Sequence, residues 1–218
     1  MVTRKFLFKL YIRKGFTLVE LLVSIAIMVI ILGITLSGGP QAIMKLTLSD
    51  NTYQSELMLR EAQLQGSAIN SLDNTFGGVG VFFDLATSSQ VLKFRDIVIP
   101  SFDRPIGIGN GLYESNPTDE KETIFSFTNN HRVGKLCTAV GIASLLCNNE
   151  NVPPIKTLTV SFNRPKQTAH IYINGATTTD FTSACIQFDS LKSPAPGYVR
   201  SILVYHSGMI TKKIGTCK

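Results

Sequence analysis

Residues 16–36 read FTLVELLVSIAIMVIILGITL, an apolar run in which Glu20 is the only charged side chain. As a helix these residues would be about 32 Å long at ~1.5 Å per residue, which is enough to cross a hydrocarbon core of ~30 Å. The run is apolar on every side, which is typical of a membrane span or a fully buried helix and not of an amphipathic surface helix. We therefore expect one membrane-spanning helix near the start of the chain.

The charge distribution predicts the orientation of this span. The 218-residue chain has a formal net charge of +6, and five basic side chains but no acid lie in residues 1–15 (Arg4, Lys5, Lys9, Arg13 and Lys14). The remaining residues hold 16 of the 21 basic side chains against 15 acidic ones. A DNA-binding domain usually carries its basic patch in the folded body. The positive-inside rule explains this pattern better, with residues 1–15 in the cytoplasm and the rest beyond the membrane.

Three kinds of N-terminal segment have this composition: a cleaved secretory signal peptide, a plain signal anchor and a specialised anchor. The apolar run exceeds the ~7–15 residues usual in signal peptides, and no small-x-small cleavage site follows it closely. A carboxylate at the centre of a span costs about 2.5–3.5 kcal/mol, less near an end, and is usually functional. Glu20 therefore favours the specialised anchor. The simpler interpretation is that Glu20 lies at the interface and reaches headgroup water.

Residues 14–23, KGFTLVELLV, resemble the class III signal of type IV prepilins and pseudopilins. The shared features are a basic leader ending in glycine, an aromatic residue next, a glutamate four residues further on, and an apolar helix following directly. The resemblance implies that a prepilin peptidase removes residues 1–15 by cutting between Gly15 and Phe16, and then methylates the Phe16 amine. It also implies that Glu20 meets the terminal amine of a neighbouring subunit during filament assembly, which relieves the cost of two unpaired charges.

The rest of the chain predicts the α+β plan of such subunits: a long N-terminal helix packed on an antiparallel β-sheet head. Residues 16–37 form the membrane and filament-core helix, and residues 38–72 form an amphipathic helix, with Met58, Ala62, Gln65 and Ile69 along one face and Leu57, Leu64 and Ala68 beside them. Gly38, Gly39 and Pro40 predict a helix break, because in a helix Gly costs about 1 kcal/mol and Pro about 3 kcal/mol. The break marks either a stem that melts on assembly or the outer membrane interface.

Residues 73–218 predict the extracytoplasmic head. Short runs rich in β-branched and aromatic residues, without helices between them, indicate antiparallel sheets. Asn174-Gly175 predicts a tight turn, and Ser207-Gly208 predicts a C-terminal hairpin. We expect strands at residues 79–85, 91–99, 123–128, 136–146, 158–162, 170–173, 184–188, 199–205 and 209–213.

All four cysteines lie in this head. In an oxidising compartment they indicate two disulfides, for which three connectivities exist. We favour Cys137–Cys147, which closes a short loop, and Cys185–Cys217, which fastens the C-terminus to a strand. The resemblance supports this choice, since disulfide loops near the C-terminus are common in pilins. A zinc site is the alternative, but the sequence has no CxxC pair.

No constellation of catalytic residues stands out. His131, His170 and His206 are dispersed, and the sequence has no GxSxG elbow. Residues 107–111 are glycine-rich but lack GxGxxG spacing. We expect no enzymatic activity, no cofactor and no metal site, and calcium binding has no support from residue spacing. The C-terminal basic residues are either a solvated strand edge or a weak, salt-sensitive DNA contact (Arg200, Lys212, Lys213 and Lys218).

The leading hypothesis is a structural subunit, a minor pilin or pseudopilin, of a type IV pilus-like or type II secretion filament. Residues 199–204 and 207–210 are similar to the subgroup of the type II secretion H pseudopilin and the FimT-like minor pilins. The resemblance implies three partners: other pilin subunits, the prepilin peptidase and an inner-membrane assembly platform. It also implies a single pass through the bacterial cytoplasmic membrane with the N-terminus inside. The rival hypothesis is a membrane-anchored adhesive or DNA-binding head for surface attachment or DNA uptake.

Overall fold

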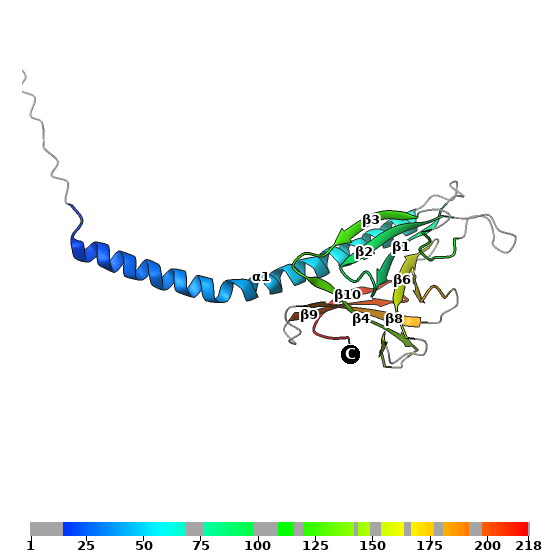
Figure 1. The fold of residues 1–218 in the computed structure, drawn as a ribbon. Coiled ribbons are helices and arrows are strands. Elements are labelled where there is room, and N and C mark those ends of the chain that lie inside the picture. Colours follow the sequence, from blue (N-terminus) through cyan, green and yellow to red (C-terminus); the bar gives the residue numbers. More distant parts are fainter. Residues whose placement is uncertain are drawn as a thin grey trace, which may run out of the picture. The chain divides into compact units, whose positions relative to one another are not determined.

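In a computed structural model the chain forms one long helix followed by β-strands (Figure 1). The structure describes residues 15–68, 76–97, 109–115, 120–141, 144–148, 154–163, 167–176, 181–191 and 198–217. The leader residues 1–14, Ile69 and Lys218, each named in the sequence predictions, lie outside the described residues. The chain divides into two compact units, Met1–Ala42 and Ile43–Lys218.

Helix α1 spans Leu18–Ala68 without interruption, so the helix break expected at Gly38, Gly39 and Pro40 is wrong. A proline inside a helix removes one i→i−4 hydrogen bond and crowds the carbonyl four residues earlier, which costs about 3 kcal/mol, and the rest of this long helix outweighs that local cost. The turns on both sides keep their hydrogen bonds, and a 51-residue helix absorbs the propensity cost of three poor helix formers. The boundary between the two compact units nevertheless follows closely, after Ala42.

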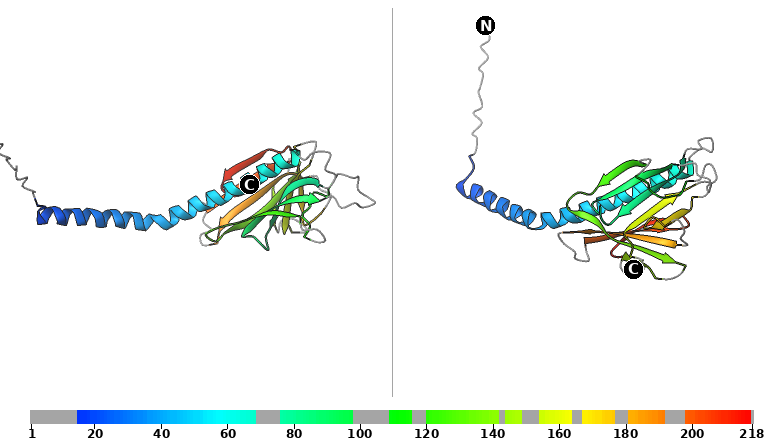
Figure 2. Two further views of the ribbon diagram at one scale, coloured as in Figure 1. Left: turned by 90° about the horizontal axis from the view of Figure 1, so that it is seen from above. Right: turned by 45° about the vertical axis from the view of Figure 1, so that its right-hand side comes forward.

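The second unit contains two five-stranded sheets whose neighbouring strands are antiparallel (Figures 1 and 2). Sheet A has the order β3 (Lys121–Ser126), β2 (Gln90–Ile97), β1 (Phe76–Asp84), β6 (Thr157–Phe162), β7 (Ala169–Ile173). Sheet B has the order β10 (Ile210–Ile214), β9 (Val199–Tyr205), β8 (Phe181–Ser190), β4 (His131–Val140), β5 (Leu146–Cys147). The predicted α+β fold, a helix packed on antiparallel sheets, is confirmed.

Turns connect neighbouring strands within a sheet and also carry the chain from one sheet to the other. It crosses from β3 in sheet A to β4 in sheet B through Asn129 and Asn130, whose φ angles of 59° and 56° are tolerated best by glycine and asparagine. The predicted hairpin at Ser207-Gly208 is confirmed, since β9 and β10 are antiparallel neighbours. The predicted tight turn after β7 is confirmed as well, with the Ala176 N–H donating to the Ile173 carbonyl at 2.9 Å.

One expected strand, residues 136–146, is wrong. The chain turns at Gly141, where φ is 62°, and then folds back. The returning segment is the short strand β5, in which Cys147 lies opposite Cys137. A single run of apolar residues thus supplies two adjacent strands, and the disulfide between those two cysteines holds them together.

A single hydrophobic core joins the second unit's part of α1 to both sheets. Its fully buried members include Leu48 and Leu59 from α1, Phe83 and Phe162 from sheet A, and Phe188 from sheet B. The predicted inward positions Met58 and Ala62 are buried, and Gln65 is half-buried. Arg60 and Glu61 of this helix are exposed.

Candidate functional site

The first turn of α1 is capped by Thr17. The Glu20 N–H donates to Thr17 Oγ1 at 3.3 Å, and the Leu21 N–H donates to the Thr17 carbonyl at 3.2 Å. Thr17 and Glu20 have the spacing of a capping box, and an acid in the first turn is favourable to the helix dipole. This cap by Thr17 was not predicted, although the T-x-x-E pattern signals it.

Gly15 and Phe16 precede the helix, and the fold itself does not explain either residue. A Cβ at Gly15 would meet no atom within 4 Å, and the backbone there is not in the left-handed region. Any small side chain would therefore fit. Phe16 is 78% exposed, an unfavourable position in water for a large aromatic ring. The choice of residues at these two positions therefore reflects something other than the stability of this chain.

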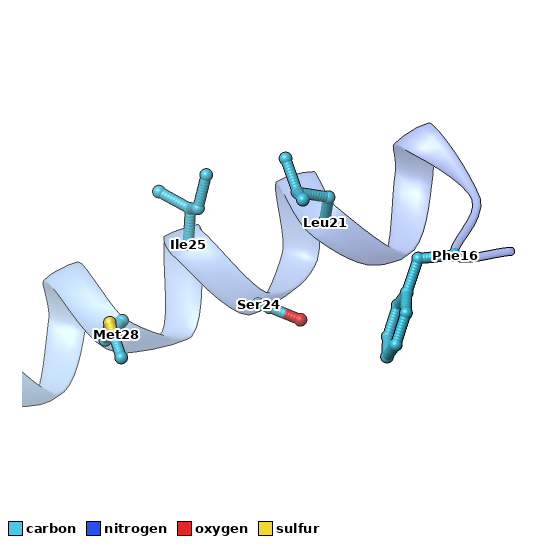
Figure 3. A pocket seen from close by; sticks show the side chains of 5 residues that line it. All are labelled: Phe16, Leu21, Ser24, Ile25 and Met28. Carbon is cyan, nitrogen blue, oxygen red and sulfur yellow. The ribbon is translucent and has the colours of Figure 1, made fainter.

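The following stretch is apolar on all sides. Residues Leu18–Thr35 have a mean hydropathy of 2.7, and none of them is buried inside the chain. Phe16, Leu21, Ser24, Ile25 and Met28 line a shallow apolar groove along the first turns, where Leu21 and Ile25 extend from the same side of the helix (Figure 3). Soluble proteins rarely expose a continuous apolar surface of this extent. The helix has the length and composition of a membrane span.

The few hydroxyl groups of this stretch are compatible with hydrocarbon. Ser24 Oγ donates to the Glu20 carbonyl at 2.7 Å, and Thr35 Oγ1 donates to the Ile31 carbonyl at 3.1 Å. These hydrogen bonds satisfy the hydroxyls within the helix, as a lipid environment requires.

In the second unit, α1 carries a further exposed apolar surface, which we call the outer stripe. Its side chains are 39% to 69% exposed and comprise Ile43, Leu46, Tyr53, Leu57 and Leu64. At about 100° per residue they fall on the side of the helix opposite the buried residues Leu48 and Leu59. The sequence analysis placed Leu57 and Leu64 beside the buried face, and this placement is wrong. The error arose because both faces of this helix are apolar, so periodicity alone did not separate them.

The structure contains the two favoured disulfides, Cys137–Cys147 and Cys185–Cys217. Their Cα–Cα distances are 4.0 Å and 5.9 Å. All four cysteines belong to one apolar cluster on sheet B, together with Leu145 and Leu203. The disulfides fix the short edge strand β5 and the C-terminal segment to the body of the sheet.

Three of the four C-terminal basic residues, Arg200, Lys212 and Lys213, lie within the described part of the chain. Lys212 and Lys213 are neighbours on β10 and therefore point to opposite faces of sheet B. Lys212 lies 3.8 Å from Glu56 and over the ring of Tyr53, so α1 partly neutralises it. Arg200 pairs across the strands with Ile214, on the same face as Lys212. Arg200 and Lys212 thus share one face of sheet B while Lys213 lies on the other, and the hypothesis of a DNA contact stays a prediction.

The three histidines are in two different places. His170 and His206 pack edge to face with ring centroids 6.2 Å apart, a pairing that the sequence did not reveal. Burial lowers the pKa of His170, and the neighbouring His206 adds to the effect. His131, on β4, is buried, and its Nδ1 lies 2.8 Å from Asn51 Nδ2 of α1. Among the described residues, no group of His, Cys, Asp and Glu side chains could hold a metal ion.

Two buried carboxylates on sheet A also escaped the sequence analysis. Asp96 Oδ2 accepts the Gly111 N–H at 2.8 Å, and Glu120 accepts the N–H groups of Ile97 and Glu114, each at 2.8 Å. These bonds hold residues 109–115 against the sheet. Burial raises the pKa of Glu120 to about 7, although its two backbone hydrogen bonds act in the opposite direction.

Comparison with known proteins finds one match within the chain. Residues 12–36 match the model of the prokaryotic N-terminal methylation motif. No curated protein and no solved structure matches the chain. The matched segment contains Gly15, Phe16, Glu20 and the apolar helix, so this region is a class III signal of the type IV prepilin kind. The match covers this segment alone, in which the motif is followed directly by an apolar helix long enough to span a membrane.

Proposed function

We propose that this protein is a structural, non-enzymatic subunit, a minor pilin or pseudopilin, of a type IV pilus-like or type II secretion filament. In this proposal a prepilin peptidase cuts after Gly15 and methylates Phe16, and the subunit then enters the filament through its apolar helix. The observation that carries the proposal is the methylation motif placed directly before an exposed apolar helix. Cleavage there leaves the helix on the product.

The charges at the new terminus support a role for Glu20 beyond capping. Cleavage places the cationic amine of Phe16 one residue before the cap, at the positive end of the helix dipole. A cation there is unfavourable, and in an apolar surrounding the penalty grows. The exposed Glu20 carboxylate, in the first turn, is a suitable counter-ion. We propose that in the filament this carboxylate pairs with the amine of a neighbouring subunit.

The outer stripe supports assembly in the second unit as well. Large apolar side chains that face water lose the stabilisation that burial gives, about 1.5–3 kcal/mol for each full burial. Helices of neighbouring subunits would cover this stripe. We propose that the partners are other pilin subunits, with an inner-membrane platform feeding the filament from a membrane-inserted pool. In that pool the basic leader lies in the cytoplasm and the head on the far side of the bacterial cytoplasmic membrane.

The test is incorporation into sheared filaments when the chain is expressed with its assembly machinery. Glu20→Ala should be processed normally but be missing from filaments, and Glu20→Gln should fail similarly because it lacks the charge. Thr17→Ala is the matched control, since it removes the cap hydrogen bond and leaves the carboxylate. If Thr17→Ala fails as badly as Glu20→Ala, a disturbed first turn of the helix is sufficient to block incorporation and the pairing proposal is wrong.

A second pair of variants tests the outer stripe. Leu57→Ser combined with Leu64→Ser should reduce incorporation without lowering the melting temperature of the head, because neither side chain belongs to the buried core. Asp50→Ser, an exposed polar position of the same helix, should leave incorporation unchanged. Normal incorporation of the double variant would mean that subunits do not pack on this stripe.

A further inference from the structure

The four cysteines form a continuous row on one face of sheet B. Cys137 on β4 lies directly opposite Cys147 on β5 on one side. On the other side it lies directly opposite Cys185 on β8. Cys217 completes the row, because it is bonded to Cys185. Cys137 therefore has two cysteine neighbours, of which only Cys147 is bonded to it.

The pair that is not bonded, Cys137 and Cys185, is directly opposed across β4 and β8 and lies close to the spacing that a disulfide requires. Residues directly opposite each other on antiparallel strands have Cβ atoms about 4.5–5.5 Å apart. A disulfide needs ~3.5–4.5 Å between Cβ atoms and ~4.4–6.8 Å between Cα atoms. Closing this pair therefore requires a shift of about 1 Å and no change of register.

The row differs in accessibility from one end to the other. Cys137 and Cys185 are fully buried and Cys217 is 8% exposed, whereas Cys147 is half-buried on the edge strand β5. Thiol–disulfide exchange depends on access of the attacking thiolate to a sulfur. An external thiolate therefore reaches the sulfur of Cys147 more easily than those of the other three cysteines.

We propose that the four cysteines are an exchange site for an external thiol or dithiol, in which attack at Cys147 releases the C-terminal segment bonded through Cys217. The external thiolate bonds to Cys147 Sγ and breaks the Cys137–Cys147 bond, which leaves a thiolate on Cys137. That thiolate is surrounded by apolar side chains, where an unpaired charge is costly. It bonds to Cys185 Sγ and breaks the Cys185–Cys217 bond, and the electron pair and then a proton go to Cys217.

A second external thiolate then removes the external group from Cys147. It attacks the external sulfur of the mixed disulfide on Cys147 and forms the external disulfide, while Cys147 leaves as a thiol. Two external thiols are oxidised, and the protein loses one disulfide. The remaining disulfide, Cys137–Cys185, joins the central strands β4 and β8. The head thus keeps a buried bridge, while hydrogen bonds hold its C-terminal segment: the Gly215 N–H donates to the Val199 carbonyl at 3.1 Å, and the Cys217 N–H donates to Gln187 Oε1 at 3.3 Å.

Two single variants test the exchange without added reductant. The full chain is purified in detergent from an oxidising compartment, alkylated with N-ethylmaleimide in denaturant and digested with trypsin. Lys and Arg positions place the cysteines in three peptides, residues 136–156, 167–192 and 214–218. In Cys147→Ser the free Cys137 should have displaced Cys217, so that 136–156 is linked to 167–192 and 214–218 is alkylated. In Cys137→Ser, which lacks the central sulfur, 167–192 should stay linked to 214–218.

The result that overturns the proposal is a Cys147→Ser protein in which 167–192 remains linked to 214–218 and Cys137 is alkylated. Wild-type protein gives a second measurement if a variant fails to fold. With limiting reduced glutathione, the first one-disulfide species should carry glutathione on Cys147 within peptide 136–156, and this peptide should be linked to 167–192. A first intermediate that keeps 167–192 linked to 214–218 would show that the two disulfides react independently. Neither measurement depends on filament assembly.

Discussion

The side chain of Asn51 fixes the turn at which the chain crosses from sheet A to sheet B. Asn51 Nδ2 donates to the Thr128 carbonyl at 3.3 Å and lies 2.8 Å from His131 Nδ1, which accepts in the neutral ring. Both Asn51 and His131 are only 2% exposed. Asn51→Ala leaves two buried acceptors without this donor, which costs about 1–3 kcal/mol. For a chain of this size that corresponds to a melting temperature lower by about 2–12 °C.

The same site predicts a pH dependence. Burial lowers the pKa of His131 below its ordinary value of 6.5, so the unfolded chain binds the proton more readily. The contribution of neutral His131 is therefore complete above about pH 6.5 and is lost as the pH falls toward the folded-state pKa. Asn51→Asp places a carboxylate beside Nδ1, where it can accept a hydrogen bond from the protonated ring. This variant should have a lower melting temperature than wild type at pH 8, and the difference between the two melting temperatures should be smaller at pH 5.5.

The assay is thermal unfolding of the detergent-solubilised chain, followed by circular dichroism between pH 5 and pH 8. Asp50→Ala is the matched control, because Asp50 is exposed on the adjacent position and should change stability by less than about 0.5 kcal/mol. If the melting temperature depends on pH equally in wild type, Asn51→Ala and Asn51→Asp, the prediction is wrong. Such a result would mean that the side chain at position 51 does not influence the protonation of His131.

Two further predictions concern the head. The pKa of Glu120 is raised to about 7, above its unfolded value, so its contribution to stability is complete below about pH 4.5 and is lost as the pH rises through 7. Glu120→Gln should therefore make the free energy of unfolding depend less on pH between 4.5 and 7. An unchanged pH dependence in this variant would contradict the raised pKa. Gly175 and Gly208 both have positive φ, but a Cβ at Gly208 would lie 2.1 Å from the backbone oxygen of Gln167, while one at Gly175 meets no atom within 4 Å. Gly175→Ala should cost about 1–2 kcal/mol for the left-handed backbone. Gly208→Ala should cost more, and equal losses in urea denaturation would contradict the predicted clash.

Local patterns in the sequence were sufficient for the signal and for the order of the elements. Gly15, Phe16 and Glu20 are defined by their spacing along the chain, and the methylation-motif model matches this spacing without reference to the fold. The apolar run and the short β-branched segments are likewise local, so the α+β plan followed from them. The cysteine pairs were favoured among three connectivities because one closes a short loop and the other fastens the chain's end.

The features that the sequence did not reveal depend on contacts between distant residues. The continuity of α1 through Pro40 depends on hydrogen bonds in flanking turns, which outweigh a local propensity. The division of residues 136–146 between β4 and β5 depends on pairing with Cys137 across a turn. The distinction between the buried face of α1 and the outer stripe requires the position of the sheets. The raised pKa of Glu120 comes from burial that only the folded chain creates.

The most direct test of the proposed maturation is the intact mass of the protein extracted from membranes after expression with a prepilin peptidase. We predict a chain that begins at Phe16, carries one methyl group on its terminal amine and retains the whole of α1. A Gly15→Val variant should keep its leader, because the proposed cleavage site is lost. The fold itself should be unaffected, because a Cβ at Gly15 would meet no atom within 4 Å. A wild-type product that still begins at Met1, or one that begins beyond residue 37 and lacks the apolar helix, would contradict the account.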